Sequence, residues 1–348
     1  MKKSRNHEIG KSPTDFVPRR GLRSAHLQTI FGNFLPRTNL LPPGERRRFV
    51  VAEHETGAKI EVECVCHWQT QPAKRRSSEA SELLSVIIVH GLEGSVDSQY
   101  VIGTGSKAWA AGMNVIRMNM RNCGDTESLT PTLYHSGLSA DVGAVAKELI
   151  DNDGLQRIAI VGFSMGGNLV MKLAGEWGGD APPQVKAFAA VSPAMDLAAS
   201  ADALHARSNW LYEQRFLRSL RRSYERKAVL FPNRYDLAHL RRFASIREFD
   251  HEITARYEGF AGADDYYERS SAARVVERIR VPTLVLHAQD DPFIRLRSET
   301  TAKLMANPAV TFIEAKHGGH CAFLATPNGY DGRWAERTVI EFLSTNTD

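Results

Sequence analysis

A serine flanked by glycines stands where a chain could present a nucleophile. The run Gly162-Phe163-Ser164-Met165-Gly166 follows a short apolar stretch and precedes an amphipathic one. The pattern G-x-S-x-G between a strand and a helix indicates a sharp turn that exposes the serine hydroxyl. The amino terminus of the following helix favours the negative charge that develops during acyl transfer. The sequence therefore predicts Ser164 as the catalytic nucleophile rather than part of a structural turn.

A serine hydroxyl needs a base, and that base needs a group to orient it. With this type of turn the chain order is serine, then a carboxylate, then histidine. Asp291 follows an apolar run at 283–287 and is the predicted orienting acid, with Asp290 as the alternative. His320 follows a second run at 310–315 and two glycines, and is the predicted base, with His317 as the alternative.

The oxyanion formed in acyl transfer requires two hydrogen-bond donors. The backbone N–H of Met165, directly after the nucleophile, is one candidate. The other is the N–H of Leu92 in the glycine-containing loop His90-Gly91-Leu92-Glu93-Gly94-Ser95, which follows the apolar run 83–89. An ordinary glycine turn is the alternative interpretation of this loop.

The segments that must position these residues alternate between strand and helix patterns. An antiparallel hairpin is expected at 46–53 and 58–68, and strands at 83–89, 113–118, 158–163, 185–191, 283–287 and 310–315. Helical patterns separate most of these runs. This alternation predicts an α/β fold with a mostly parallel sheet covered by helices on both faces.

Domain organisation follows from where this alternation stops. We expect an irregular amino-terminal arm at 1–44 and a core formed by 45–192 and 282–348, with a polar loop at 69–81. Residues 193–281 are predicted to form a helical cap inserted before the last two strands. Its many arginines are interpreted as a solvated face rather than an anion-binding surface.

Composition limits the possible partners and location. The chain has 348 residues and a net charge of +4, too small and scattered to indicate nucleic-acid binding. Its four cysteines form no CxxC pair, and neither a secretory signal nor a membrane span is visible, which predicts a cytoplasmic protein. No metal-ligand spacing such as HExxH occurs, so no metal is expected. Peripheral membrane contact through the cap is compatible with the mildly basic charge, and the oligomeric state is left open.

Several separate motifs resemble those of a known family. The chain resembles the α/β-hydrolase superfamily over about 45–345, and more narrowly its YheT-like branch, the AB hydrolase 4 family. The narrower resemblance rests on the following motifs: His26-Leu27-Gln28-Thr29-Ile30, His90–Ser95, Met120-Arg121-Asn122-Cys123-Gly124-Asp125, Gly162–Asn168, Arg247-Glu248-Phe249-Asp250, Asp265-Tyr266-Tyr267 and Asp290-Asp291-Pro292-Phe293. It departs from the branch pattern at Asn122 and Ala322, where glycine is frequent.

This resemblance implies a Ser-His-Asp triad that hydrolyses carboxylic esters without a metal or organic cofactor. We therefore expect a serine esterase acting on a small acyl ester or lipid-like ester. An acyltransferase that uses the same triad is one alternative, and a non-catalytic binding protein on a hydrolase scaffold is another.

Overall fold

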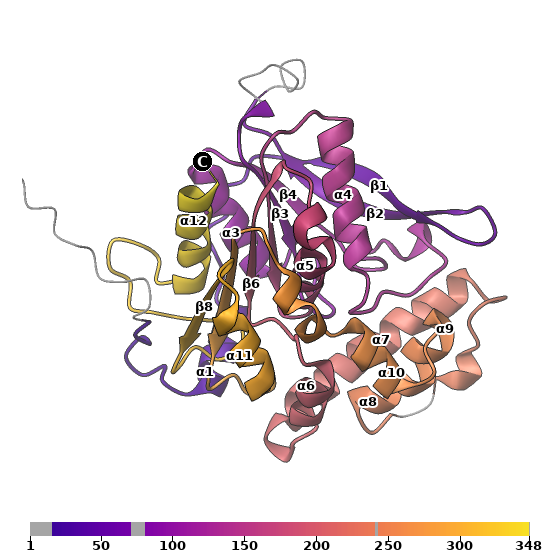
Figure 1. Ribbon diagram of the computed structural model, residues 1–348. Coiled ribbons are helices and arrows are strands. Elements are labelled where there is room, and N and C mark those ends of the chain that lie inside the picture. The colour runs from indigo at the N-terminus through magenta and orange to yellow at the C-terminus, as the bar shows by residue number, and fades with distance from the viewer. Residues whose placement is uncertain (1–15, 71–80, 241–242, 348) are drawn as a thin grey trace, which may run out of the picture.

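The computed structural model describes residues 16–70, 81–240 and 243–347 (Figure 1). Eight strands within these ranges form one sheet in the order β1-β2-β4-β3-β5-β6-β7-β8. Their bounds are β1 (Glu45–Glu53), β2 (Lys59–His67), β3 (Ser85–Val89), β4 (Asn114–Met118), β5 (Ile158–Phe163), β6 (Val185–Val191), β7 (Thr283–Ala288) and β8 (Val310–Ala315). Strand β2 pairs antiparallel with both β1 and β4, whereas every pairing from β4 to β8 is parallel. The predicted mostly parallel sheet is confirmed.

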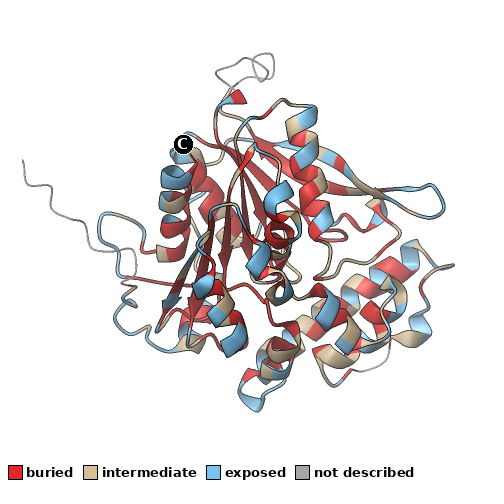
Figure 2. Ribbon diagram, viewed as in Figure 1, coloured by how far each residue is buried: buried red, intermediate tan, exposed pale blue. Residues whose placement is uncertain are grey.

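Helices cover both faces of this sheet. On one face, α4 (Ser139–Asp151), α5 (Met165–Trp177) and α11 (Ser298–Ala306) pack against the strands. On the other, α3 (Gln99–Ala110) and α12 (Trp334–Asn346) complete a second apolar cluster. The central strands β3, β4 and β5 are buried at every position, so their near-continuous apolar sequences reflect contact with helices on both sides (Figure 2).

Between β6 and β7 the chain forms a separate group of helices, which lies beyond the carboxyl ends of the parallel strands (Figure 1). These helices share their own apolar cluster, which also includes Phe293 and Ile294 from the loop after β7. They are α6 (Leu197–Leu204), α7 (Trp210–Leu230), α8 (Ile246–Phe249), a π-helical stretch (Asp250–Ala255), α9 (Arg256–Glu258) and α10 (Ala263–Ser270). The division into core and cap at 193–281 remains a prediction.

The amino-terminal arm differs from the sequence-based expectation. An irregular arm was expected at 1–44, but Ala25–Phe34 form helix α1. The irregular expectation was wrong; the polar side of α1 is buried against residues nearly 300 positions away. Residues 1–15 of the arm, and 71–80 of the polar loop expected at 69–81, lie outside the described residues. None of the helices in the described ranges has the length and apolar character that a bilayer span requires.

Candidate active site

Ser164 occupies the turn between β5 and α5 with a strained backbone. Its φ of 55° and ψ of −117° place a non-glycine residue in a region that costs conformational energy and is found mainly at functional sites. The turn requires glycines on either side, because a Cβ on Gly162 would overlap the carbonyl of Gly166. A Cβ on Gly166 would in turn overlap the carbonyl of His90 in the neighbouring loop. Close packing thus fixes the position of the Ser164 hydroxyl.

The structure brings Ser164, His320 and Asp291 together in series. The Nε2 atom of His320 lies 2.9 Å from Ser164 Oγ, and its Nδ1 atom lies 2.8 Å from Asp291 Oδ2. Ser164, Asp291 and His320 follow β5, β7 and β8, so all three stand at the carboxyl edge of the parallel strands. An imidazole in this arrangement can accept the serine proton while the carboxylate holds its other nitrogen protonated.

Burial and neighbouring groups shift the pKa values of Asp291 and His320 in opposite directions. Burial raises the pKa of Asp291, but His320 and the backbone N–H of Ile294 outweigh burial, and the net pKa is lowered. Burial lowers the pKa of His320, but neighbouring Cys321 and the Asp291 carboxylate raise it by more, so that it lies above 6.5. Asp291 therefore remains ionised, which favours an imidazole whose Nδ1 carries the proton.

The two alternative residues pair with each other instead. The Nδ1 atom of His317 lies 3.2 Å from Asp290 Oδ2, and Asp290 Oδ1 accepts a 2.9 Å hydrogen bond from the Gly319 N–H. Asp290 therefore caps the turn that precedes His320. Neither residue lines a cavity that reaches Ser164.

Leu92 and Met165 flank the serine on the side of the predicted oxyanion hole. Both line the same cavity as Ser164, and within the described part of the chain neither backbone N–H donates a hydrogen bond. Adjacent N–H groups are held firmly, because Gly91 donates to the Tyr100 hydroxyl at 2.9 Å and Glu93 donates to the Tyr134 hydroxyl at 3.2 Å. The two N–H groups are therefore available to a ligand.

The Glu93 side chain links this loop to helix α7. Its carboxylate accepts hydrogen bonds from Tyr134 Oη at 2.5 Å, Ser219 Oγ at 2.5 Å and Ser223 Oγ at 2.9 Å. Because Ser219 and Ser223 belong to α7, the position of that helix is linked to the loop that carries Leu92. The sequence alone did not indicate this structural role of Glu93.

Helix α1 supports the His320 loop, a function that sequence analysis missed. The His320 backbone N–H donates to Thr29 Oγ1 at 2.9 Å. Gln28 and Leu324 exchange two hydrogen bonds, of 2.7 and 3.1 Å. Gly32 allows the close contact, because a Cβ there would overlap Ala322. The arm therefore holds the segment that presents His320.

A signal for this helix was present in the sequence. Apolar residues recur at helical spacing after Ser24, a residue type that often begins helices: Leu27, Ile30, Phe31 and Phe34. However, these four are the exposed residues, whereas Gln28, Thr29 and Gly32 are buried. The helix thus buries its polar side, which is the reverse of the usual pattern.

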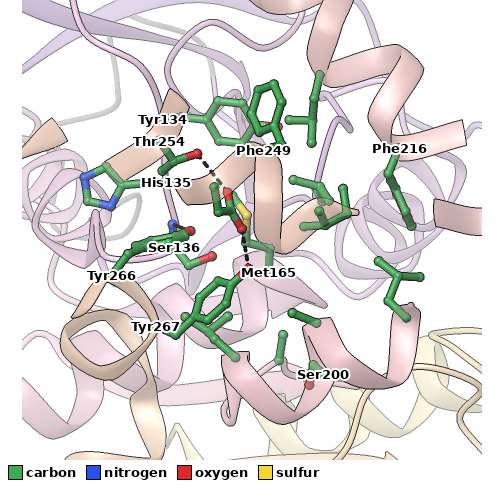
Figure 3. Close-up of a pocket in the computed structure, with 18 of the residues that line it drawn as sticks. Tyr134, His135, Ser136, Met165, Ser200, Phe216, Phe249, Thr254, Tyr266 and Tyr267 are labelled. Atoms are coloured by element: carbon green, nitrogen blue, oxygen red, sulfur yellow. Dashed lines mark hydrogen bonds between the residues drawn. The ribbon is translucent and has the colours of Figure 1, made fainter. Parts of the chain in front are cut away.

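A cavity of about 1040 Å³, open mouth included, is lined by Ser164 and by the helices between β6 and β7. We call it the cap cavity, and Figure 3 shows part of its lining. Its walls are mainly aliphatic and aromatic side chains, among them Leu204, Phe216 and Phe249. Asp250 also faces it, accepting hydrogen bonds from Thr254 at 2.8 Å and Tyr267 at 2.7 Å. Burial raises the pKa of Asp250 to about 6 despite these bonds. In the described ranges no cluster of His, Cys, Asp or Glu could hold a metal ion.

The chain is similar to several known proteins. The family model for the alpha/beta hydrolase fold matches residues 85–327. YheT of Escherichia coli is 31% identical over 336 residues, covering 96% of this chain and 94% of that protein. A monoacylglycerol lipase of Saccharomyces cerevisiae is 23% identical, covering 92% and 78%. The esterase Pf2001 of Pyrococcus furiosus has the same fold, with a TM-score of 0.55 at 14% identity over 89% of this chain and 99% of that one.

Proposed function

Because this chain belongs to the α/β-hydrolase family, within its YheT-like branch, we propose that it is a serine hydrolase of carboxylic esters. Relatives named as an esterase and as a monoacylglycerol lipase support the hydrolysis of esters. The observation that carries the proposal is the continuous series from Ser164 Oγ through both nitrogens of His320 to Asp291, with separations of 2.9 and 2.8 Å.

In the proposed mechanism Ser164 Oγ attacks the ester carbonyl while His320 Nε2 takes the hydroxyl proton. The carbonyl oxygen becomes an oxyanion that accepts hydrogen bonds from the N–H groups of Leu92 and Met165. As the tetrahedral intermediate collapses, His320 gives its proton to the leaving alkoxide oxygen and an acyl-serine remains. Water then attacks the acyl carbon with His320 again as base, releasing the carboxylic acid.

The cap cavity supports acyl esters of lipid-like character as the substrates. Aliphatic and aromatic walls favour a hydrocarbon chain, because transfer of apolar surface from water is favourable. The similarity to a yeast monoacylglycerol lipase is compatible with this assignment.

Substitution of Ser164 tests the proposal. Ser164→Ala should reduce kcat for p-nitrophenyl butyrate by on the order of 10⁶-fold, because the nucleophile is lost while the fold remains. The wild-type protein should react with a fluorophosphonate at Ser164. His320→Ala should also abolish turnover, whereas His317→Ala provides the matched control and should retain it. Turnover by the Ser164→Ala protein, or absence of a Ser164 adduct in the wild type, would reject the proposal.

A further inference from the structure

Ser164 stands where two cavities meet. Besides the cap cavity, a second cavity of about 960 Å³, open mouth included, lies between α1 and α7; we call it the α1 cavity. The two share Leu92, Ser164, Phe216 and Phe293. An ester held at Ser164 has an acyl part and an alcohol part, so the two cavities could separate them.

The position of His320 distinguishes the two cavities. His320 lines the α1 cavity but not the cap cavity. During collapse of the tetrahedral intermediate its Nε2 must transfer a proton to the leaving oxygen, which requires the leaving group to lie within hydrogen-bond reach of that nitrogen. The alcohol part therefore belongs on the α1 side, and the acyl chain on the cap side.

The side chains of the cap cavity are consistent with an acyl chain. Several polar groups that reach its wall are bonded within the protein: Asp250 to Thr254 and Tyr267, Tyr134 to Glu93, and the Tyr266 hydroxyl to the Ser136 N–H. Figure 3 shows Tyr134, Thr254, Tyr266 and Tyr267 beside the apolar Phe216 and Phe249, among other lining residues. Polar groups that are already satisfied leave the hydrocarbon surface as the main contact for a ligand.

The α1 cavity carries polar groups without such partners. The Asn33 amide donates to the Thr29 carbonyl at 2.9 Å, which leaves its side-chain oxygen free to accept a hydrogen bond. The Arg215 guanidinium lies 5.3 Å from the centre of the Phe34 ring and forms no ion pair with any described residue. A hydroxyl group of a ligand can donate a hydrogen bond to an amide oxygen such as that of Asn33 and accept one from a guanidinium such as that of Arg215.

From these observations we propose that the α1 cavity is the alcohol subsite and takes hydroxyl-bearing alcohols of the glycerol type, while the cap cavity takes the acyl chain. This assignment rests on the proposed ester hydrolysis. Thr29, Ile30, Asn33 and Phe34 of α1 line the alcohol subsite and lie outside residues 85–327, so the arm contributes specificity from beyond the segment that the family model matches.

Two substrate series separate the subsites. The first varies the acyl chain from acetyl to octanoyl on p-nitrophenol, and the second varies the alcohol of butyrate from ethanol to glycerol. Asn33→Leu should lower the ratio of kcat/KM for glyceryl monobutyrate to that for ethyl butyrate about threefold to tenfold, the effect of one lost hydrogen bond. Its acyl-chain profile should match that of the wild type. Arg215→Met should act in the same direction.

Ala201→Leu gives the complementary change, because Ala201 lines only the cap cavity. It should shift the acyl optimum to shorter chains and leave the alcohol ratio unchanged. Leu27→Gln is the control on α1, since Leu27 lines neither cavity. The assignment would be overturned if Asn33→Leu changed the acyl-chain profile and Ala201→Leu changed the alcohol ratio. It would also be overturned if Asn33→Leu left the alcohol ratio unchanged and Ala201→Leu left the acyl-chain profile unchanged.

Binding without turnover separates this inference from the proposed function. Octanoate should bind Ser164→Ala protein in calorimetric titration, more weakly after Ala201→Leu and unchanged after Asn33→Leu. If wild-type protein hydrolyses no ester yet octanoate binding follows this pattern, the proposed function fails while the cap cavity keeps its ligand. If esters are hydrolysed but octanoate binding responds to Asn33→Leu instead of Ala201→Leu, the subsite assignment alone is wrong.

Discussion

The turn at Ser164 and helix α1 position the residues of the proposed triad in different ways. The turn is built from consecutive residues, since β5, Ser164 and α5 are contiguous and two glycines relieve its crowding. Helix α1 acts across the chain, because Thr29 meets His320 only after 291 residues. The local sequence therefore determines the geometry of the Ser164 turn. Helix α1, in contrast, contacts the His320 loop only after distant elements have packed together.

This difference teaches that the proposed nucleophile and the proposed base depend on different parts of the chain. Ser164 is held by close backbone packing, whereas His320 lies in a loop held between Asp291 on one side and α1 on the other. Substitutions near the turn or at Asp291 should therefore remove activity almost completely. Substitutions in α1 should reduce activity only in part.

After substitution of Ser164 or His320 themselves, the largest effect should come from Asp291→Asn. We expect kcat for p-nitrophenyl butyrate to fall by about 10⁴-fold, because the amide no longer fixes the imidazole with Nδ1 protonated. Asp290→Asn is the matched control: it alters a residue paired with His317, and kcat should remain within about threefold, the effect of one modest hydrogen bond. Steady-state kinetics of both variants decide the matter; equal losses would contradict our assignment of Asp291.

Asp290 and Asp291 also show how much of the candidate site could be predicted from the sequence. Asp291 could be preferred over Asp290 from its place after a strand, and the strands themselves follow from near-continuous apolar runs buried on both faces. The contact between Asp290 and His317, however, could not be predicted from the sequence, because it requires the conformation of the Gly318-Gly319 turn. That conformation depends on tertiary packing.

The contacts of helix α1, rather than the helix itself, were beyond sequence reasoning for a related reason. Its apolar residues recur at helical spacing, but the side that it buries is polar. Gln28 and Thr29 are satisfied by backbone groups of the His320 loop, so their burial depends on partners that no local pattern specifies. The lining of the cap cavity likewise combines side chains that are far apart in the sequence, from Leu92 to Ile294.

A smaller effect should appear in the pH dependence. His320 acts as a base only when neutral, so kcat/KM should rise with pH and fall about tenfold for each unit below the pKa of His320. Because Cys321 and Asp291 outweigh burial and raise this pKa, the midpoint should lie above 6.5. Cys321→Ala should shift the midpoint to lower pH, as measured by kcat/KM between pH 5 and 10. An unshifted midpoint would show that the sulfur has no influence on the imidazole.

A still smaller effect on kcat should come from Thr29→Val, which keeps the shape of the side chain but removes the acceptor for the His320 N–H. The loop should loosen slightly and kcat should fall roughly tenfold, because a slightly misplaced base is costly to rate. KM should change little, and Thr29→Ser should restore kcat since it keeps the hydroxyl. Kinetics combined with thermal unfolding distinguish this positioning role from general destabilisation: a lower Tm with an unchanged kcat would mean that α1 stabilises the fold without positioning His320.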